Sequence, residues 1–246
     1  MSNSKYGYVC MGLDIENTGW DLTKHAIVQI GLSVWNVVNG KRKKIDSFSV
    51  LINVPADREW EERCVTEFWN KSPELVEMKR KIDNKEGKEP ETAMQEMVDF
   101  SMKCFKDYAY SNINNIRFIV DTVSFDACWV NLYLAQYIGS KPLHLLFGGF
   151  RDLIETGSYM QGRSGITHDD ELELIKIDEE KRKDSGKEGR GHFSCEESCF
   201  KKRKITETAL AEHNHDAESD AANIVETYLI VMYSKDPSAT TKKSKK

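Results

Sequence analysis

Apolar and polar positions alternate in blocks along the first part of the chain. The apolar runs Tyr6–Ile15, Ala26–Val38 and Ile45–Val54 have the length and the content of branched and aromatic residues that favour β-strands. Asn39-Gly40 lies between the second and the third run, and this dipeptide is typical of a two-residue hairpin turn. The pattern therefore predicts three consecutive strands that pair antiparallel.

Beyond these runs, helical periodicity alternates with short apolar stretches. Helices are predicted over Glu61–Lys81, Glu91–Tyr110, Phe125–Ile138 and Ala217–Ser234, with another near Phe150–Tyr159. Short strands are predicted at Ile116–Val120 and His144–Phe147. Strands first, then helices that alternate with strands, predict an α/β fold with a mixed sheet and helices on both sides.

The composition changes between residues 163 and 204. Charged residues and glycines dominate there and the hydrophobic periodicity fades, which predicts a surface insertion that is partly helical at Asp169–Arg182. Residues 235–246 form a basic tail that ends in KKSKK, and we expect it to be disordered. The interpretation is one domain over residues 1–234, with residues 163–204 as an insertion.

The net charge of −5, from 40 acidic and 35 basic residues, is not that of a protein that holds nucleic acid by bulk positive charge. Binding of a polyanion would need local patches or bound cations. The first residues do not resemble a signal peptide, and no apolar run is long enough to span a bilayer. The six scattered cysteines are typical of buried thiols in a reducing compartment. We expect a soluble, intracellular protein without a membrane partner.

Two carboxylates follow the first predicted strand in the sequence Asp14-Ile15-Glu16-Asn17-Thr18-Gly19. Alternate residues of a strand share a face, so Asp14 and Glu16 point the same way. Their mutual repulsion would raise both pKa values unless a cation neutralises them. Mg²⁺ and Mn²⁺ prefer oxygen ligands of this kind, whereas a solvated strand end is the ordinary alternative.

A third carboxylate, Asp126, follows Phe125 at the start of a predicted helix, just after the apolar strand Ile116–Val120. Acids at this position are also common helix caps. Asp121 competes for the same role. We prefer Asp126, because Phe125 can anchor the turn in front of it.

The last predicted helix opens with His215-Asp216-Ala217-Glu218-Ser219-Asp220-Ala221. Asp220 lies about one turn inside this helix, and small residues follow it that permit a close approach to a neighbouring strand. His215 lies at the edge in front of the helix. An acid near a helix N-terminus is also favoured by the helix dipole, and His213 and Asp216 are nearby substitutes that rank lower.

The order D-x-E-x-T-G, F-D and H-x-x-x-x-D-A closely resembles the DEDD (DnaQ-like) superfamily of 3′→5′ exonucleases, in its histidine-bearing branch. This branch includes proofreading subunits of DNA polymerases, RNase T and oligoribonuclease. His25–Gly31 is similar to the second strand of the family, and Glu67-Phe68-Trp69 followed by Pro73 is similar to a segment of phage exonuclease A and related bacterial RNases. Asp121-Thr122-Val123-Ser124 departs from the family, where many relatives carry His-Asn.

The resemblance implies a ribonuclease H-like fold with a five-stranded mixed sheet flanked by helices. It implies that Asp14, Glu16, Asp126 and Asp220 hold two Mg²⁺ or Mn²⁺ ions and that His215 is the general base. Thr18, Gly19 and Trp20 would contact the terminal nucleotide, with Trp20 stacked on a base or simply packed at the rim. The expected activity removes nucleoside 5′-monophosphates from the 3′ end of DNA or RNA.

Three further interpretations follow from the sequence. His192-x-x-Cys195-x-x-x-Cys199 offers three zinc ligands at irregular spacing without an evident fourth, so a lid or specificity insertion is the better interpretation. Lys201–Lys204 and the tail are either phosphate contacts or solvated charge. An inactive nucleic-acid-binding scaffold of the same fold is the alternative function. The expected partner is a nucleic acid with a single-stranded 3′ end, with homodimerisation or association with a polymerase or repair complex as further expectations.

Overall fold

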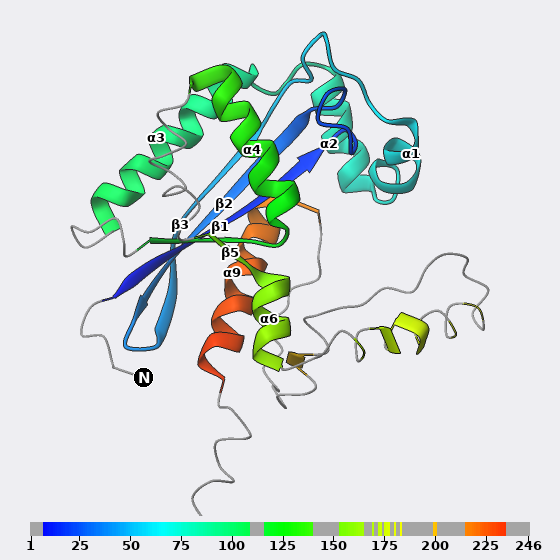
Figure 1. The fold of residues 1–246 in the computed structure, drawn as a ribbon. Coiled ribbons are helices and arrows are strands. Elements are labelled where there is room, and N and C mark those ends of the chain that lie inside the picture. Colours follow the sequence, from blue (N-terminus) through cyan, green and yellow to red (C-terminus); the bar gives the residue numbers. More distant parts are fainter. Residues whose placement is uncertain are drawn as a thin grey trace, which may run out of the picture. The chain divides into compact units, whose positions relative to one another are not determined.

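The computed structural model describes residues 7–108, 116–139, 153–164 and 215–234, with a few further positions between 169 and 200. Its central element is a five-stranded sheet in the order β3-β2-β1-β4-β5 (Figure 1). The strands are β1 (Tyr8–Asn17), β2 (Ile27–Val38), β3 (Lys41–Leu51), β4 (Ile116–Val120) and β5 (Leu153–Glu155). The pairs β1–β2 and β2–β3 are antiparallel, whereas β1–β4 and β4–β5 are parallel. The predicted mixed sheet is confirmed.

The turn between β2 and β3 is the predicted two-residue hairpin. Asn39 and Gly40 both have positive φ angles, 51° and 76°. Asparagine and glycine adopt this left-handed conformation at the lowest cost, and two such residues in succession match the right-handed twist of the strands. β1 runs two residues further than predicted, so Glu16 lies inside the strand.

The helices are α1 (Glu62–Cys64), α2 (Pro73–Asp83), α3 (Pro90–Tyr108), α4 (Cys128–Tyr133), α6 (Thr156–Ser164) and α9 (Ala217–Tyr233). Three π-helical turns accompany them: η1 (Val65–Trp69), η3 (Val123–Ala127) and η4 (Leu134–Ile138). α3 and α9 confirm two of the predicted helices within two residues at each end. The helix predicted over Phe125–Ile138 consists of η3, α4 and η4 in succession.

The single helix predicted over Glu61–Lys81 is wrong. The chain forms α1 and η1, breaks at residues 70–72, and starts again as α2. The side chain of Ser72 accepts a hydrogen bond from the backbone N–H of Leu75 at 3.3 Å, and Pro73 occupies the first helical position. A serine cap followed by proline begins a new helix, because proline has no N–H to continue the old one.

The helix predicted near Phe150–Tyr159 is wrong in its first part. Residues 153–155 form β5, which pairs with β4 through Phe118–Leu153 and Ile119–Ile154. Helix α6 begins only at Thr156. Pairing with a strand some thirty residues earlier overrides the local helical periodicity, which sequence spacing does not show. The strand predicted at His144–Phe147 lies outside the described residues.

The main hydrophobic core lies on one face of the sheet. Alternate residues of β1 and β2 point to this face, among them Val9, Met11, Leu13 and Leu32, all at most 2% exposed. They pack against buried side chains of α3 and α4, which cover the same face in Figure 1. On the opposite face, Gly12 of β1 and Gly31 of β2 leave room for the start of α9.

The chain divides into two compact units: Met1–Glu155 with Leu210–Glu226, and Thr156–Ala209 with Thr227–Lys246. The first contains the sheet. In the second, Met160 of α6, Cys199 and Val231 of α9 form a small buried cluster. Most of the predicted insertion and the whole tail lie outside the described residues. No helix among the described residues has the length and apolar character to cross a membrane.

Candidate active site

Two glycines bring the start of α9 into direct contact with the sheet. A Cβ atom on Gly31 of β2 would lie 2.0 Å from the carbonyl carbon of Ala217. A Cβ atom on Gly12 of β1 would lie 2.2 Å from the carbonyl oxygen of Ala221. Both distances are far below any normal contact, so only glycine allows the helix to lie this close. The approach positions Asp220 over the strand that carries Asp14 and Glu16.

Gln29 of β2 holds the N-terminus of α9 in place. Its side-chain amide donates to Oδ1 of Asp216 at 2.9 Å and accepts from the backbone N–H of Ala217 at 3.2 Å. Asp216 in turn accepts hydrogen bonds from the N–H and the hydroxyl of Ser219, as a helix N-cap does. This capping role separates Asp216 from Asp220, which lies inside the helix and is 2% exposed.

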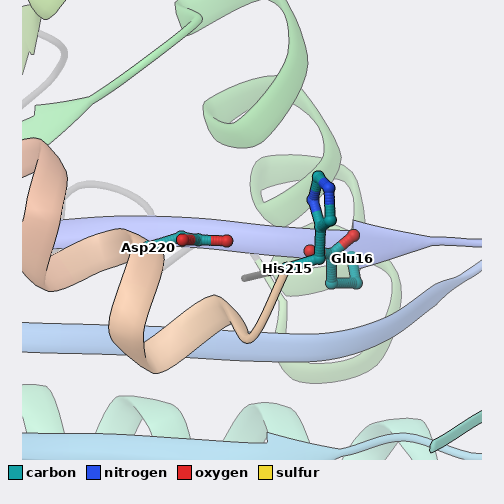
Figure 2. Close-up of side chains that lie close together, drawn as sticks. All are labelled: Glu16, His215 and Asp220. Atoms are coloured by element: carbon teal, nitrogen blue, oxygen red, sulfur yellow. The ribbon is translucent and has the colours of Figure 1, made fainter. Parts of the chain in front are cut away.

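Glu16, His215 and Asp220 meet at this point (Figure 2). One ligand atom from each side chain lies within 4.8 Å of those of the other two, so the three can bind a single cation together. Glu16 and Asp220 are buried, and His215 is half-buried. The backbone of His215 has φ +56°, a left-handed conformation that is uncommon for a residue other than glycine.

Asp14 does not belong to this group of three residues, but its carboxylate interacts electrostatically with the carboxylates of Glu16 and Asp220. Burial raises its pKa well above the ordinary value, and the carboxylates of Asp126, Glu16 and Asp220 raise it further. The pKa of Glu16 is likewise raised by burial, and then by Asp220 and Asp126. Glu16, Asp126 and Asp220 are buried and Asp14 is half-buried. The repulsion among these four carboxylates favours the binding of protons or cations.

Asp126 and Asp121 differ sharply in environment. Asp126 lies in η3, is 4% exposed, and accepts a hydrogen bond from the N–H of Thr122 at 3.2 Å. Burial raises its pKa to about 7, and the charge of Asp121 adds to this rise. Asp121 is exposed. Of the two, only Asp126 offers a buried carboxylate to the cluster.

Thr18 and Gly19 shape the turn after β1. The hydroxyl of Thr18 donates to the carbonyl of Glu59 at 2.7 Å and accepts from the N–H of Ala26 at 2.9 Å, so this fully buried side chain is used within the protein. A Cβ atom on Gly19 would lie 2.5 Å from Nδ1 of His25. The turn is therefore closely packed against the segment that leads into β2.

Trp20 is 73% exposed, and its ring centroid lies 5.6 Å from that of Phe125. Both rings line a pocket of about 270 Å³ that also includes Glu16. The complete lining is Ile15, Glu16, Asn17, Trp20, Arg63, Cys64, Glu67, Phe68, Lys71 and Phe125. The pocket combines aromatic rings, two cationic side chains and one carboxylate of the cluster.

Phe68 was not predicted as a site residue, although the Glu67-Phe68-Trp69 segment contained the signal. Its ring lies edge-on against His215, with centroids 4.6 Å apart and planes inclined by 74°. The neighbouring Trp69 is fully buried and donates from Nε1 to the carbonyl of Asn17 at 3.1 Å. Trp69 therefore fixes η1 to β1, and this places Phe68 against the histidine.

Several weaker predictions fall outside the described residues: His213, His192, Cys195 and the basic run 201–204. The third residue of the zinc hypothesis, Cys199, is buried in the small cluster of the second unit. The five described cysteines are free thiols: Cys10, Cys104 and Cys199 are buried, Cys64 is half-buried and Cys128 is exposed.

No model of a known protein family matches the chain, and no curated protein matches it by sequence. Solved structures do match. Cell-death related nuclease 4 has a TM-score of 0.52 at 14% identity, over 91% of this chain and 63% of that one. Escherichia coli exonuclease I in complex with a dT13 oligonucleotide has a TM-score of 0.54 at 12% identity, over 95% of this chain and 43% of that one.

These likenesses define the fold. The chain has the ribonuclease H-like α/β fold of the two nucleases, as its mixed five-stranded sheet indicates. It spans less than two thirds of the length of either protein.

Proposed function

We propose that this protein is a divalent-metal-dependent 3′→5′ exonuclease of the histidine-bearing DEDD type, which releases nucleoside 5′-monophosphates. The observation that carries the proposal is the convergence of four carboxylates from three separate parts of the chain, with a histidine beside them. Asp14 and Glu16 come from β1, Asp126 from η3 and Asp220 from α9. The ribonuclease H-like fold, which two nucleases share, supports it.

The donor set fits hard divalent cations. All four acidic groups supply oxygen, which Mg²⁺ and Mn²⁺ prefer. The raised pKa values of Asp14, Glu16 and Asp126 reflect burial and the negative charge of neighbouring carboxylates. Asp14, Glu16, Asp126 and Asp220 would hold two such ions. Bound there, the ions would stabilise charge on the attacking and leaving oxygens of an in-line displacement.

The remaining residues have distinct tasks. The imidazole of His215 would accept a proton from the attacking water, a role suited to a side chain that ordinarily exchanges protons near neutral pH. Phe68 restricts the orientation of that imidazole through its edge contact. Trp20 and Phe125 would stack on the terminal base, which favours an unpaired, single-stranded 3′ end.

The test is the digestion of 5′-labelled single-stranded and double-stranded RNA and DNA with Mg²⁺, Mn²⁺ or a chelator. We expect a ladder of shortened products from single strands with either metal, none with chelator, and slower digestion when the 3′ end carries a phosphate. Immediate release of the labelled 5′ nucleotide would contradict the polarity. Asp14→Asn should remove the activity and leave the fold intact.

An inactive nucleic-acid-binding scaffold is the competing function. The buried carboxylates speak against it, because a protein that only binds a polyanion has no use for an uncompensated negative cluster at its binding pocket. Retention of oligonucleotide binding without any metal-dependent product would favour the scaffold.

A further inference from the structure

The face of β3 next to α9 carries polar and cationic side chains that the proposed catalytic site does not use. β3 is the edge strand next to β2, and its pairing with β2 fixes which residues share a face. Ser49 pairs with Gly31, Ser47 with Ser33, Lys44 with Trp35 and Arg42 with Val37. A bulge at Ile45 adds one residue to β3, so Lys44 and Arg42 lie on the same face as Ser49 and Ser47. Ser49, Ser47, Lys44 and Arg42 therefore lie along the face on which α9 rests over Gly31, and we call them the β3 lane.

The β3 lane begins at the carboxylate cluster. Ser49 accepts a hydrogen bond from Gln29 at 3.1 Å, and the same amide group of Gln29 donates to Asp216 beside His215. At the other end, Lys44 contacts Glu218 in the first turn of α9 at 3.4 Å. The eight residues from Arg42 to Ser49 are separated by seven steps along the strand, which cover about 23 Å at the rise of an extended strand. The lane thus leads from the site past the start of α9 to the β2–β3 hairpin.

Positive charge is concentrated at the hairpin end. Lys41, Arg42, Lys43 and Lys44 are four consecutive cationic residues in a chain whose net charge is −5. Three of them are exposed and Arg42 is half-buried. Lysines on an edge strand commonly prevent edge-to-edge pairing of sheets. Four consecutive cationic residues also form a local patch that can bind a polyanion.

Aromatic rings accompany these charges on the same face. Trp35 is half-buried and lies opposite Lys44 in the sheet. Tyr8, which pairs with Val37, lies 4.2 Å from the guanidinium of Arg117. Cationic side chains beside aromatic rings are the usual components of sites for single-stranded nucleic acid, where lysine and arginine contact phosphates and rings stack on bases.

We propose that the β3 lane is the track for the part of the substrate strand that lies upstream of its 3′ end, with Arg42 and Lys44 as phosphate contacts and Trp35 as a stacking surface. This inference rests on the proposed function, since it assigns a path to the same substrate. The small hydroxyl side chains of Ser47 and Ser49 leave room for a nucleic-acid backbone beside α9. Long single strands then bind more tightly than short ones.

The hairpin itself supplies a matched control. Lys41 and Lys43 alternate with Arg42 and Lys44, so they point to the other face of the sheet. The double variants Arg42→Ala with Lys44→Ala, and Lys41→Ala with Lys43→Ala, remove the same charge from the same hairpin. Only the first pair belongs to the β3 lane.

The experiment measures KM for a dinucleotide and for a single-stranded dodecanucleotide, together with anisotropy of the labelled dodecanucleotide in chelator. We expect the lane variant to weaken binding of the long strand about tenfold and to lower the slope of log K against log salt by ~1.4, for two lost phosphate contacts. The dinucleotide KM should not change, and the control variant should behave as wild type.

Equal losses of dodecanucleotide binding in both double variants, or no loss in either, would contradict the proposal that the β3 lane binds the substrate strand. Failure of the wild type to cleave any strand would instead overturn the proposed function. In that case the anisotropy measurement still decides whether the lane binds single strands.

Discussion

Gly31 lies directly beneath Ala217, with no room for even one additional carbon atom between the strand and the helix. Because the obstructing atoms belong to the backbone of α9, no side-chain rotation can relieve the contact. The position of Asp220 over Glu16 therefore depends on the absence of a side chain at Gly31.

Gly31→Ala should displace the start of α9 and abolish activity. Overpacking of this kind typically costs 1–3 kcal/mol, and contact with rigid backbone places the expected loss at about 3 kcal/mol of unfolding free energy. Chemical denaturation and the oligonucleotide assay together measure both effects. Gly162→Ala in α6 is the control, because nothing lies within 4 Å of the added carbon and alanine favours a helix. A stable, active Gly31→Ala protein would contradict the arrangement.

The two middle aspartates should differ in their effect on catalysis. Asp126→Ala removes a buried carboxylate of the cluster and should eliminate detectable activity, since loss of a metal ligand removes several kcal/mol of transition-state stabilisation. Asp121→Ala removes an exposed charge and should lower kcat/KM about tenfold, or 1–2 kcal/mol. Both values are measured on one short substrate, and the reverse order would transfer the metal role to Asp121.

Stability without metal should decline as the pH rises. Burial raises the pKa of Asp126 to about 7, and the pKa values of Asp14 and Glu16 are raised as well. An unfolded aspartate titrates near 4, so between about pH 4 and pH 7 the folded protein binds more protons than the unfolded chain. The free energy of unfolding therefore falls across this window as the protons are lost.

Thermal melts in chelator and in Mg²⁺ test this dependence. Mg²⁺ should raise Tm more near pH 8 than near pH 5, because protons and metal ions compete for the same carboxylates. Asp126→Asn should flatten the decline in chelator. An increase of Tm between about pH 5 and pH 7 in chelator that Asp126→Asn does not alter would speak against the buried cluster.

Trp20→Ala should impair binding of the substrate without affecting the fold, since the side chain is 73% exposed. A base stacked on an aromatic ring contributes about 1–3 kcal/mol, which corresponds to a loss of kcat/KM between about fivefold and about 160-fold, mainly through KM. Trp20→Phe should retain much of the wild-type kcat/KM, because phenylalanine also offers a ring for stacking. Leu22→Ala, in the same turn and 38% exposed, provides the control. Equal losses for Trp20→Ala and Leu22→Ala would argue against stacking.

The sequence was sufficient where the signal is local. Alternation along β1 placed Asp14 and Glu16 on one face, and Asn39-Gly40 located the hairpin. The break at residues 70–72 was also readable, from Ser72 followed by Pro73, but helical periodicity on both sides obscured it. A cap signal should have taken precedence there.

Other features depend on contacts between distant residues and could not be predicted. Nothing in the sequence around Gly12 or Gly31 indicates that a helix will rest on them, and the hydrogen bond between Gln29 and Asp216 joins residues 187 positions apart. β5 forms only because β4 offers it an edge. The contact of Phe68 with His215 likewise requires the folded chain.

Asp14 and Glu16 are far from His215 and Asp220 in the sequence. This separation determines when the carboxylate cluster can form during synthesis. Ribosomes deliver the N-terminal part first, and the strands with Asp14 and Glu16 emerge long before α9. Closing a loop of this length is entropically costly and makes docking of the helix a late folding event. A nascent chain that lacks α9 has neither His215 nor Asp220, so its carboxylate cluster is incomplete. The complete site therefore forms only after α9 has been synthesised and has docked on the sheet.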